Sequence, residues 1–300
     1  MHPAPSVIVF TVLSGAGFGL LAFLALGAVE VYGPAAFLLW GVGYGLTVAG
    51  LFVSAFHLGN PSRALRAFTQ WRTSWLSREA WASAGALLLL APVALAAVMG
   101  GRLPGHFGLV GAVACLIAVV STAMIYAQLK TVPRWNHWTT PALFLAFAAT
   151  SGAILSGQAR IAALLCLALG GVLILAFRLG DGRFAAAGQT LTTATGLGQD
   201  GRVRQFAPAH TGPNYLTREM IHVVGRRHAM RLRVVAVIFA SLLPFLGLLV
   251  LPPVLPVMAA VFAVHLLGAF VARWLFFAEA EHVVGLYYGQ RQGGSGVRWV

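Results

Sequence analysis

Residues 7–29 have the sequence VIVFTVLSGAGFGLLAFLALGAV, which contains no charged side chain. A helix needs roughly 20 apolar residues to cross the hydrocarbon core of a bilayer, and this run is long enough. No basic segment precedes it and no small-residue cleavage site follows it, so we expect a retained membrane span and not a signal peptide. Within it, Gly15 and Gly19, with Ser14 and Gly17 nearby, predict close packing against another helix backbone.

The rest of the chain continues this pattern. Of its 300 residues, 59% are hydrophobic and 9% are charged, and the mean hydropathy is +0.84, whereas soluble domains contain about 25% charged residues. We therefore predict an all-α, polytopic integral membrane protein in which residues 1–300 form a single membrane domain. Hydropathy indicates eight transmembrane helices, at about 7–29, 35–57, 79–99, 107–128, 139–157, 161–178, 234–251 and 254–278.

The distribution of basic residues predicts the orientation. Eight spans place both termini on one face of the membrane, and that face holds most of the 20 Lys and Arg residues, whereas the opposite face holds Arg102 and Arg160. The positive-inside rule then places the termini and the basic loops in the cytoplasm, with the spans in a bacterial inner membrane. The same loops could instead dock an acidic partner. No nucleic-acid partner is expected, because these residues lie in loops against lipid and no recognition module is visible.

The two cysteines, Cys115 and Cys166, lie within apolar runs and are expected to be small buried side chains. The sequence has no CxxC motif and no cysteine cluster. We therefore expect this chain to bind no metal ion, iron–sulfur cluster or c-type haem of its own.

The one long polar segment, 179–232, is predicted to lie outside the membrane and to be a partner-docking segment. Its first half is rich in Gly and Thr and is predicted to be irregular. Its second half, 215–233, could form an amphipathic helix with an apolar face and a basic face. Two interpretations stay open for that helix: a basic helix in the membrane interface, or a docking surface for a peripheral protein.

The connection between the second and third spans is the candidate functional site. Asn60-Pro61 is a favourable helix start, and the basic, Trp-rich residues that follow predict a short interfacial helix, after which Ser77 could cap the third span. His57 closes one span and Glu79 opens the next on the same face, so their side chains could share a pocket. A quinone head group carries two oxygens that exchange protons as electrons move, and His and Glu suit that chemistry.

Each of these residues also has a structural interpretation. His57 could be an interfacial side chain that reaches toward water. Glu79 could stabilise a helix N-terminus or form an ion pair with Arg78.

Three further polar residues lie in or beside the spans. Glu30 is expected to be a solvated acid at a span end. His265 could form a hydrogen bond between helices or line a proton path, and the first is favoured. Arg273 could pair with an acid near the end of the last span, Glu279 or Glu281, or contribute to the quinol pocket.

Two motifs resemble a known family. The opening MHPAPSVIVFT of residues 1–11, followed by SGAG at 14–17, resembles the start of the membrane anchor subunit of dimethyl sulfoxide reductase. The runs HLGNPSRA at 57–64 and WRTSWLSRE at 71–79 resemble the same family, as does the eight-span layout. The resemblance implies that His57 and Glu79 bind menaquinol. Arg78, Trp75 and Gly59 flank them in the motif and are further candidates for quinol binding.

In that family the anchor passes electrons from quinol to a four-cluster iron–sulfur subunit, which supplies a molybdopterin catalytic subunit. The resemblance therefore implies a quinol-oxidising anchor in anaerobic-type respiration, embedded in membrane lipid, with those two subunits as partners. Three alternatives stay open. The anchor could reduce quinone in the opposite direction. A b-type cytochrome would need paired axial ligands, yet His57 and His265 lie at unequal depth. A secondary transporter would be expected to show repeated halves, and none is visible.

Overall fold

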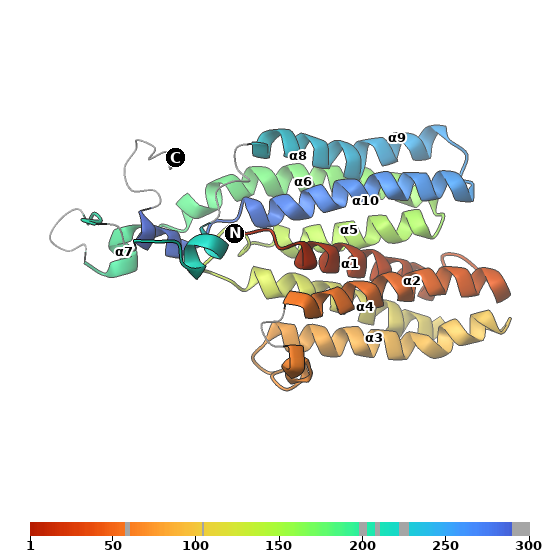
Figure 1. The fold of residues 1–300 in the computed structure, drawn as a ribbon. Coiled ribbons are helices and arrows are strands. Elements are labelled where there is room, and N and C mark those ends of the chain that lie inside the picture. The colour runs from red at the N-terminus through yellow and green to blue at the C-terminus, as the bar shows by residue number, and fades with distance from the viewer. Residues whose placement is uncertain (58–60, 104, 198–202, 208–210, 222–227, 290–300) are drawn as a thin grey trace.

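The computed structural model is an elongated bundle of helices that run side by side (Figure 1). It describes residues 1–57, 61–103, 105–197, 203–207, 211–221 and 228–289, with only the backbone described at 57 and 61–64. No β-strand occurs among these residues, so the predicted all-α fold is confirmed. The long helices are α1 (Pro5–Ala25), α2 (Gly33–Ser54), α3 (Trp75–Val98), α4 (Gly105–Ala127), α5 (Thr139–Leu155), α6 (Ala159–Ala186), α8 (Ala229–Val237), α9 (Leu243–Val250) and α10 (Leu255–Ala278).

Seven helical segments in the described residues are long and apolar enough to cross a membrane. One of them, Ala229–Val250, consists of α8, a π-helical turn (η5, Ile238–Leu242) and α9 in direct succession. The remaining predicted span corresponds to α5, which has 17 residues and therefore measures only about 25 Å at roughly 1.5 Å per residue. The polytopic class is confirmed, whereas the count of eight spans stays a prediction.

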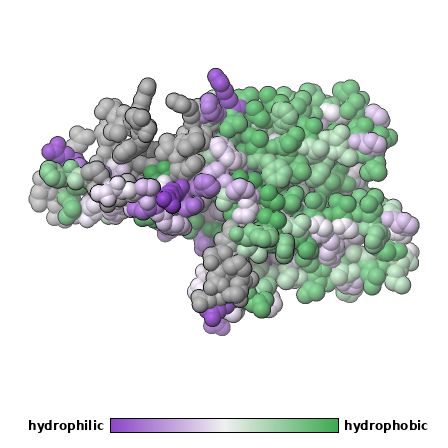
Figure 2. Space-filling model, in the orientation of Figure 1, coloured by the Kyte–Doolittle hydropathy of each residue, from purple (hydrophilic) through white to green (hydrophobic). Residues whose placement is uncertain are grey.

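The long connections gather at one end of the bundle, together with the N-terminus (Figure 1). The amino group of Met1 donates a hydrogen bond of 2.8 Å to the carbonyl of Ala280, so this segment contacts the end of α10. Figure 2 shows the most hydrophilic residues at this end and a hydrophobic surface along the helices. At the opposite end the turns are tight; Gly157, with a φ of 75°, allows α5 to turn directly into α6. The cytoplasmic placement of the polar end stays a prediction.

Helix α1 is the centre of the bundle. Buried residues make up 72% of its apolar window, against 22% for α3. A Cβ added at Gly19 would lie 1.9 Å from the carbonyl oxygen of Ala148 on α5, and one at Gly17 would lie 2.3 Å from the hydroxyl of Thr47 on α2. The predicted close packing is therefore confirmed at Gly17 and Gly19. It is wrong for Gly15, which has no such neighbour within 4 Å because it borders a small cavity.

Helix α6 extends eight residues beyond the span end that hydropathy indicates at 178, and ends at Ala186. Tertiary contacts outweigh the weak helix propensity of the two glycines in this extension. Asp181 lies 3.0 Å from Arg134, and Arg183 donates a hydrogen bond of 3.2 Å to the carbonyl of Asn136. Both partners lie on the connection between α4 and α5, which the extension of α6 therefore holds in place.

The continuous helix predicted over 215–233 is wrong. The described residues form a π-helical turn (η3, Leu216–Met220), and the helix is interrupted at Ile221, before α8 begins at Ala229. The backbone N–H of His2 donates a hydrogen bond of 2.7 Å to the carbonyl of Glu219, which ties the turn to the N-terminal segment. Residues 222–227 lie outside the described residues. Docking of a partner by 179–232 stays a prediction.

Candidate functional site

The connection between α2 and α3 contains two 3₁₀ segments, η1 (Ala55–His57) and η2 (Pro61–Phe68), so the predicted short helix is present there as a 3₁₀ helix. The N-cap position of α3 is occupied by Ser74, and the expectation that Ser77 caps this helix is wrong. Ser77 lies inside α3, where its hydroxyl donates to the carbonyl of Ala67 and accepts a hydrogen bond of 3.0 Å from the backbone of Gln70. Ser77 therefore ties the connection to α3.

Arg78 and Trp75 face this connection. The guanidinium of Arg78 donates hydrogen bonds of 2.9 Å and 2.7 Å to the carbonyls of Trp71 and Arg72, and it lies 4.4 Å from the centre of the Trp75 ring. Within the described residues Arg78 forms no ion pair with Glu79. The structural interpretation that Glu79 is the partner of Arg78 is therefore wrong.

Glu79 lies inside the bundle and is 5% exposed. Its carboxylate accepts a long hydrogen bond of 3.4 Å from Thr122 on α4, and the single hydroxyl proton of Thr122 is shared between Glu79 and the carbonyl of Ala118, which lies closer at 3.0 Å. Ser83, one turn further along α3, is buried and its hydroxyl has no hydrogen-bond partner in the described part of the chain. No Lys, Arg or His there forms an ion pair with Glu79. Such an isolated buried acid is a candidate for proton exchange with a bound molecule.

The rest of the predicted pocket is described only in part. The backbone of His57 ends η1, which contacts α1 and η2. The side chain of His57 and the whole of Gly59 lie outside the described residues. The pairing of His57 and Glu79 in one pocket therefore stays a prediction.

A second group of charged residues lies near the end of α6, the start of α8 and the end of α10. The carboxylate of Glu279 accepts hydrogen bonds of 2.5 Å from Arg134 and 2.6 Å from Arg233. Asp181 binds the same two arginines, at 3.0 Å and 2.5 Å. We call Arg134, Asp181, Arg233 and Glu279, which alternate in charge around a closed circuit, the ion ring. Sequence reasoning assigned its arginines to membrane topology and missed it.

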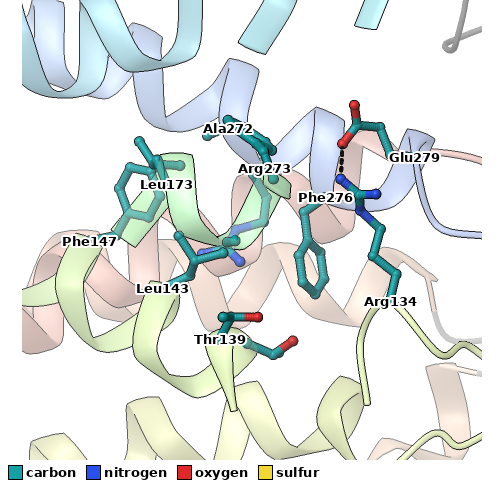
Figure 3. A pocket seen from close by; sticks show the side chains of 12 residues that line it. Arg134, Thr139, Leu143, Phe147, Leu173, Ala272, Arg273, Phe276 and Glu279 are labelled. Atoms are coloured by element: carbon teal, nitrogen blue, oxygen red, sulfur yellow. Dashed lines mark hydrogen bonds and ion pairs between the residues drawn. The ribbon is translucent and has the colours of Figure 1, made fainter. Parts of the chain in front are cut away.

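Arg273 is a buried cation beside the ion ring. It is 5% exposed, and its guanidinium lies 3.7 Å from the centre of the Phe144 ring. Figure 3 shows the side chain extending between Leu143, Phe147 and Phe276, while Glu279 points toward Arg134. Among the described residues Arg273 has no acidic partner. The expected pairing with an acid at the end of α10 is therefore wrong.

His265 joins three helices in the middle of the bundle. Its Nε2 lies 2.9 Å from the hydroxyl of Ser151 on α5, and its Nδ1 lies 2.8 Å from the carbonyl of Ala240 in η5. A carbonyl oxygen only accepts, so Nδ1 carries the proton and donates it to Ala240. A Cβ added at Gly268 would lie 2.0 Å from the backbone nitrogen of Ala240, so α10 contacts the π-helical turn closely. The expected hydrogen bond between helices is confirmed.

Two other polar residues lie near the ends of the bundle. Glu30 forms an ion pair of 2.8 Å with Arg102, and both side chains are 62% exposed, as expected of a solvated acid. His137, on the connection between α4 and α5, lies 2.9 Å from Thr139. Partial burial and the nearby Arg183 guanidinium lower the pKa of His137 below its usual range, so it is neutral at pH 7.

The fold and these residues define a class of protein: a polytopic, all-helical membrane protein with buried acids and cations gathered at its polar end. No three His, Cys, Asp or Glu side chains are placed to hold a metal ion in the described ranges. Comparison with known proteins narrows the class. The family model described as the DMSO reductase anchor subunit (DmsC) matches residues 1–289. The chain belongs to this family and is a membrane anchor of a molybdoenzyme complex, associated with a catalytic oxidoreductase subunit.

A curated relative is similar over almost the full length. The chain is 35% identical to a protein from Allochromatium vinosum that is named as a subunit of sulfite dehydrogenase, and the alignment covers 96% of this chain and 99% of that protein. No solved structure matches.

Proposed function

We propose that this chain is the quinol-oxidising subunit of its complex and that Glu79 exchanges a proton with the quinol. The isolation of Glu79 carries the proposal. A buried carboxyl group that served only to stabilise the fold would be expected to have a cationic partner, because a buried unpaired charge is costly. Glu79 instead has hydroxyl neighbours, and it lies on the first turns of α3, beneath the connection that resembles the family's quinol motif.

Oxidation of a quinol to a quinone releases two electrons and two protons. The electrons would pass to a four-cluster iron–sulfur subunit and from there to a molybdopterin catalytic subunit, and the protons need acceptors in this chain. Glu79 and His57 would accept them, while Arg78, Trp75 and Gly59 would shape the entrance. Menaquinol is the expected donor, as in anaerobic-type respiration. Glu79 lines none of the three described cavities.

Substitution of Glu79 tests the proposal directly. Glu79→Gln removes the titratable group and keeps its size, and we expect quinol-driven turnover to fall about 100-fold or more, as for loss of a general acid–base group. His57→Ala is expected to act in the same way. Activity with a soluble dye that reduces the catalytic subunit directly should be unchanged. Glu30→Gln, which alters an exposed acid at the opposite end, is the matched control and should have normal quinol turnover. Normal turnover in Glu79→Gln would refute the role of Glu79.

Quinone reduction at the same site is a second candidate. The name of the relative, sulfite dehydrogenase, describes an enzyme that oxidises its substrate, and an anchor of such an enzyme would pass electrons to quinone. The purified complex can be assayed in both directions, with quinol plus dimethyl sulfoxide and with quinone plus sulfite. Turnover only in the second assay would reverse the proposed direction and keep the proposed site.

Localisation in a bacterial inner membrane, with the polar end in the cytoplasm, rests on the positive-inside rule. Single cysteines introduced at 191 and 103, on opposite ends of the bundle, would test it. A membrane-impermeant thiol reagent added to intact cells should label only the cysteine at 103. Labelling of 191 instead would place the polar end outside the cytoplasm.

A further inference from the structure

A cavity of about 40 Å³ lies between α5, α6 and α10, and three charged side chains line it: Arg134, Arg273 and Glu279 (Figure 3). The other lining residues are mainly apolar, among them Leu143, Phe147 and Leu173. A second cavity of about 10 Å³ borders Arg273 on the side of α1. Arg273 therefore borders two cavities.

The protein supplies no counter-charge for Arg273 within the described residues. Its guanidinium is surrounded by aromatic rings, at 3.7 Å from Phe144 and 5.5 Å from Phe276, measured to the ring centres. Its Nε is buried without a hydrogen-bond partner there. Contact with a ring face stabilises a cation by less than the cost of removing that cation from water. The aromatic contacts alone do not offset that cost.

The neighbouring acids are already paired. Glu279 and Asp181 are shared by Arg134 and Arg233 in the ion ring. With Arg273 included, three guanidinium groups face two carboxylates, so these five side chains together carry one positive charge in excess. Arg134 lines the same cavity as Arg273. One negative charge in that cavity would balance the region.

We propose that this cavity binds a small monovalent anion, of the size of chloride or formate, as the counter-ion of Arg273. The cavity of about 40 Å³ exceeds the roughly 10–15 Å³ that one water molecule requires, so a small ion with a water molecule fits. It is far smaller than the roughly 300 Å³ of a pocket for an organic ring. The bound anion links α10 to α5 and α6 through Arg273. This inference does not depend on the role of Glu79.

Unfolding of the full chain in detergent, at constant ionic strength, tests the proposal. Chloride, bromide and formate are titrated against gluconate, which is too large for the cavity. Ligand that binds only the folded state raises its stability as the site fills. We expect a saturable rise in unfolding temperature with the small anions and none with gluconate. Arg273→Gln should abolish the rise, Arg273→Lys should weaken it, and Arg102→Gln, which alters an exposed arginine at the opposite end, should preserve it.

A structure of the wild-type chain in bromide gives a second readout that does not need a folded variant. We expect an anomalous bromide peak within ion-pair distance of the Arg273 guanidinium. The proposal would be overturned if the unfolding temperature were the same in gluconate as in the small anions. It would also be overturned if the small anions raised the unfolding temperature of Arg273→Gln as much as that of the wild-type chain. Displacement of bromide by a quinol analogue that takes its place at Arg273 would also overturn it, because the ligand would then be a quinol oxygen.

Discussion

Glu79 and Glu279 are buried to a similar degree, at 5% and 7% exposed; Glu79 lies near the start of α3 and Glu279 directly follows α10. Their partners differ. Glu279 accepts hydrogen bonds from two guanidinium groups at 2.5 Å and 2.6 Å, whereas Glu79 accepts one from the hydroxyl of Thr122 at 3.4 Å. Burial alone therefore does not distinguish a structural acid from a functional one. The two acids are distinguished by whether a cationic side chain lies beside them.

The largest effect on stability is expected at Glu279. Glu279→Gln leaves Arg134 and Arg233, each 15% exposed, with Asp181 as their one acid in the ion ring. Breaking a buried ion pair from one side costs about 3–5 kcal/mol, and we expect a loss of that size in the free energy of unfolding. Unfolding by denaturant in detergent measures it. Glu79→Gln, measured in parallel, should change little; equal losses in the two variants would remove the distinction between the two acids.

A smaller effect is expected at Asp181. This side chain makes ion pairs with the same two arginines as Glu279 but is 51% exposed, so water screens its charge. Exposed pairs contribute about 1 kcal/mol or less, and Asp181→Asn should lower the free energy of unfolding by about that amount. The same denaturant titration measures it. A loss as large as that of Glu279→Gln would mean that the ion ring acts as one unit. The burial of each acid would then not determine how much that acid contributes to the free energy of unfolding.

The smallest effect is expected at Thr122. Thr122→Val keeps the shape of the side chain and removes the hydroxyl that contacts Glu79. A long hydrogen bond contributes about 0.5 kcal/mol, the low end of the usual range, which corresponds to a change of about twofold in quinol-driven rate. Steady-state turnover with quinol measures it, with the soluble dye as control. A loss as severe as that of Glu79→Gln would show that Thr122 itself takes part in proton transfer.

The span positions were predictable because apolar runs of this length have few alternatives. The ion ring was not predictable, because its four pairs join residues 46, 47, 52 and 145 positions apart. Its arginines lie among many basic residues at the polar end, and nothing in their local sequence marks them. The helices had to be placed side by side before the circuit of charges could be recognised.

Two errors have a simple geometric cause. Arg273 and Glu279 are six residues apart, which is about 1.7 helical turns, so they do not share a face of α10. Arg78 and Glu79 are adjacent, and adjacent residues on a helix point in directions about 100° apart. Proximity in sequence suggested ion pairs in both cases. The helix directs one member of each pair elsewhere, which leaves Arg273 and Glu79 buried without a partner of opposite charge among the described residues.

The central position of α1 has a consequence for biosynthesis. The backbone contacts of Gly19 are with α5 and those of Gly17 are with α2, and α1 also contacts α4 and α10, so its surroundings are completed by helices that follow it in the chain, one of which begins at Thr139. During translation α1 enters the membrane well before α5 exists. Until α5 has been inserted, the side of α1 that α5 covers in the folded protein must contact lipid. The order in which the spans are inserted therefore differs from the order in which the core can close.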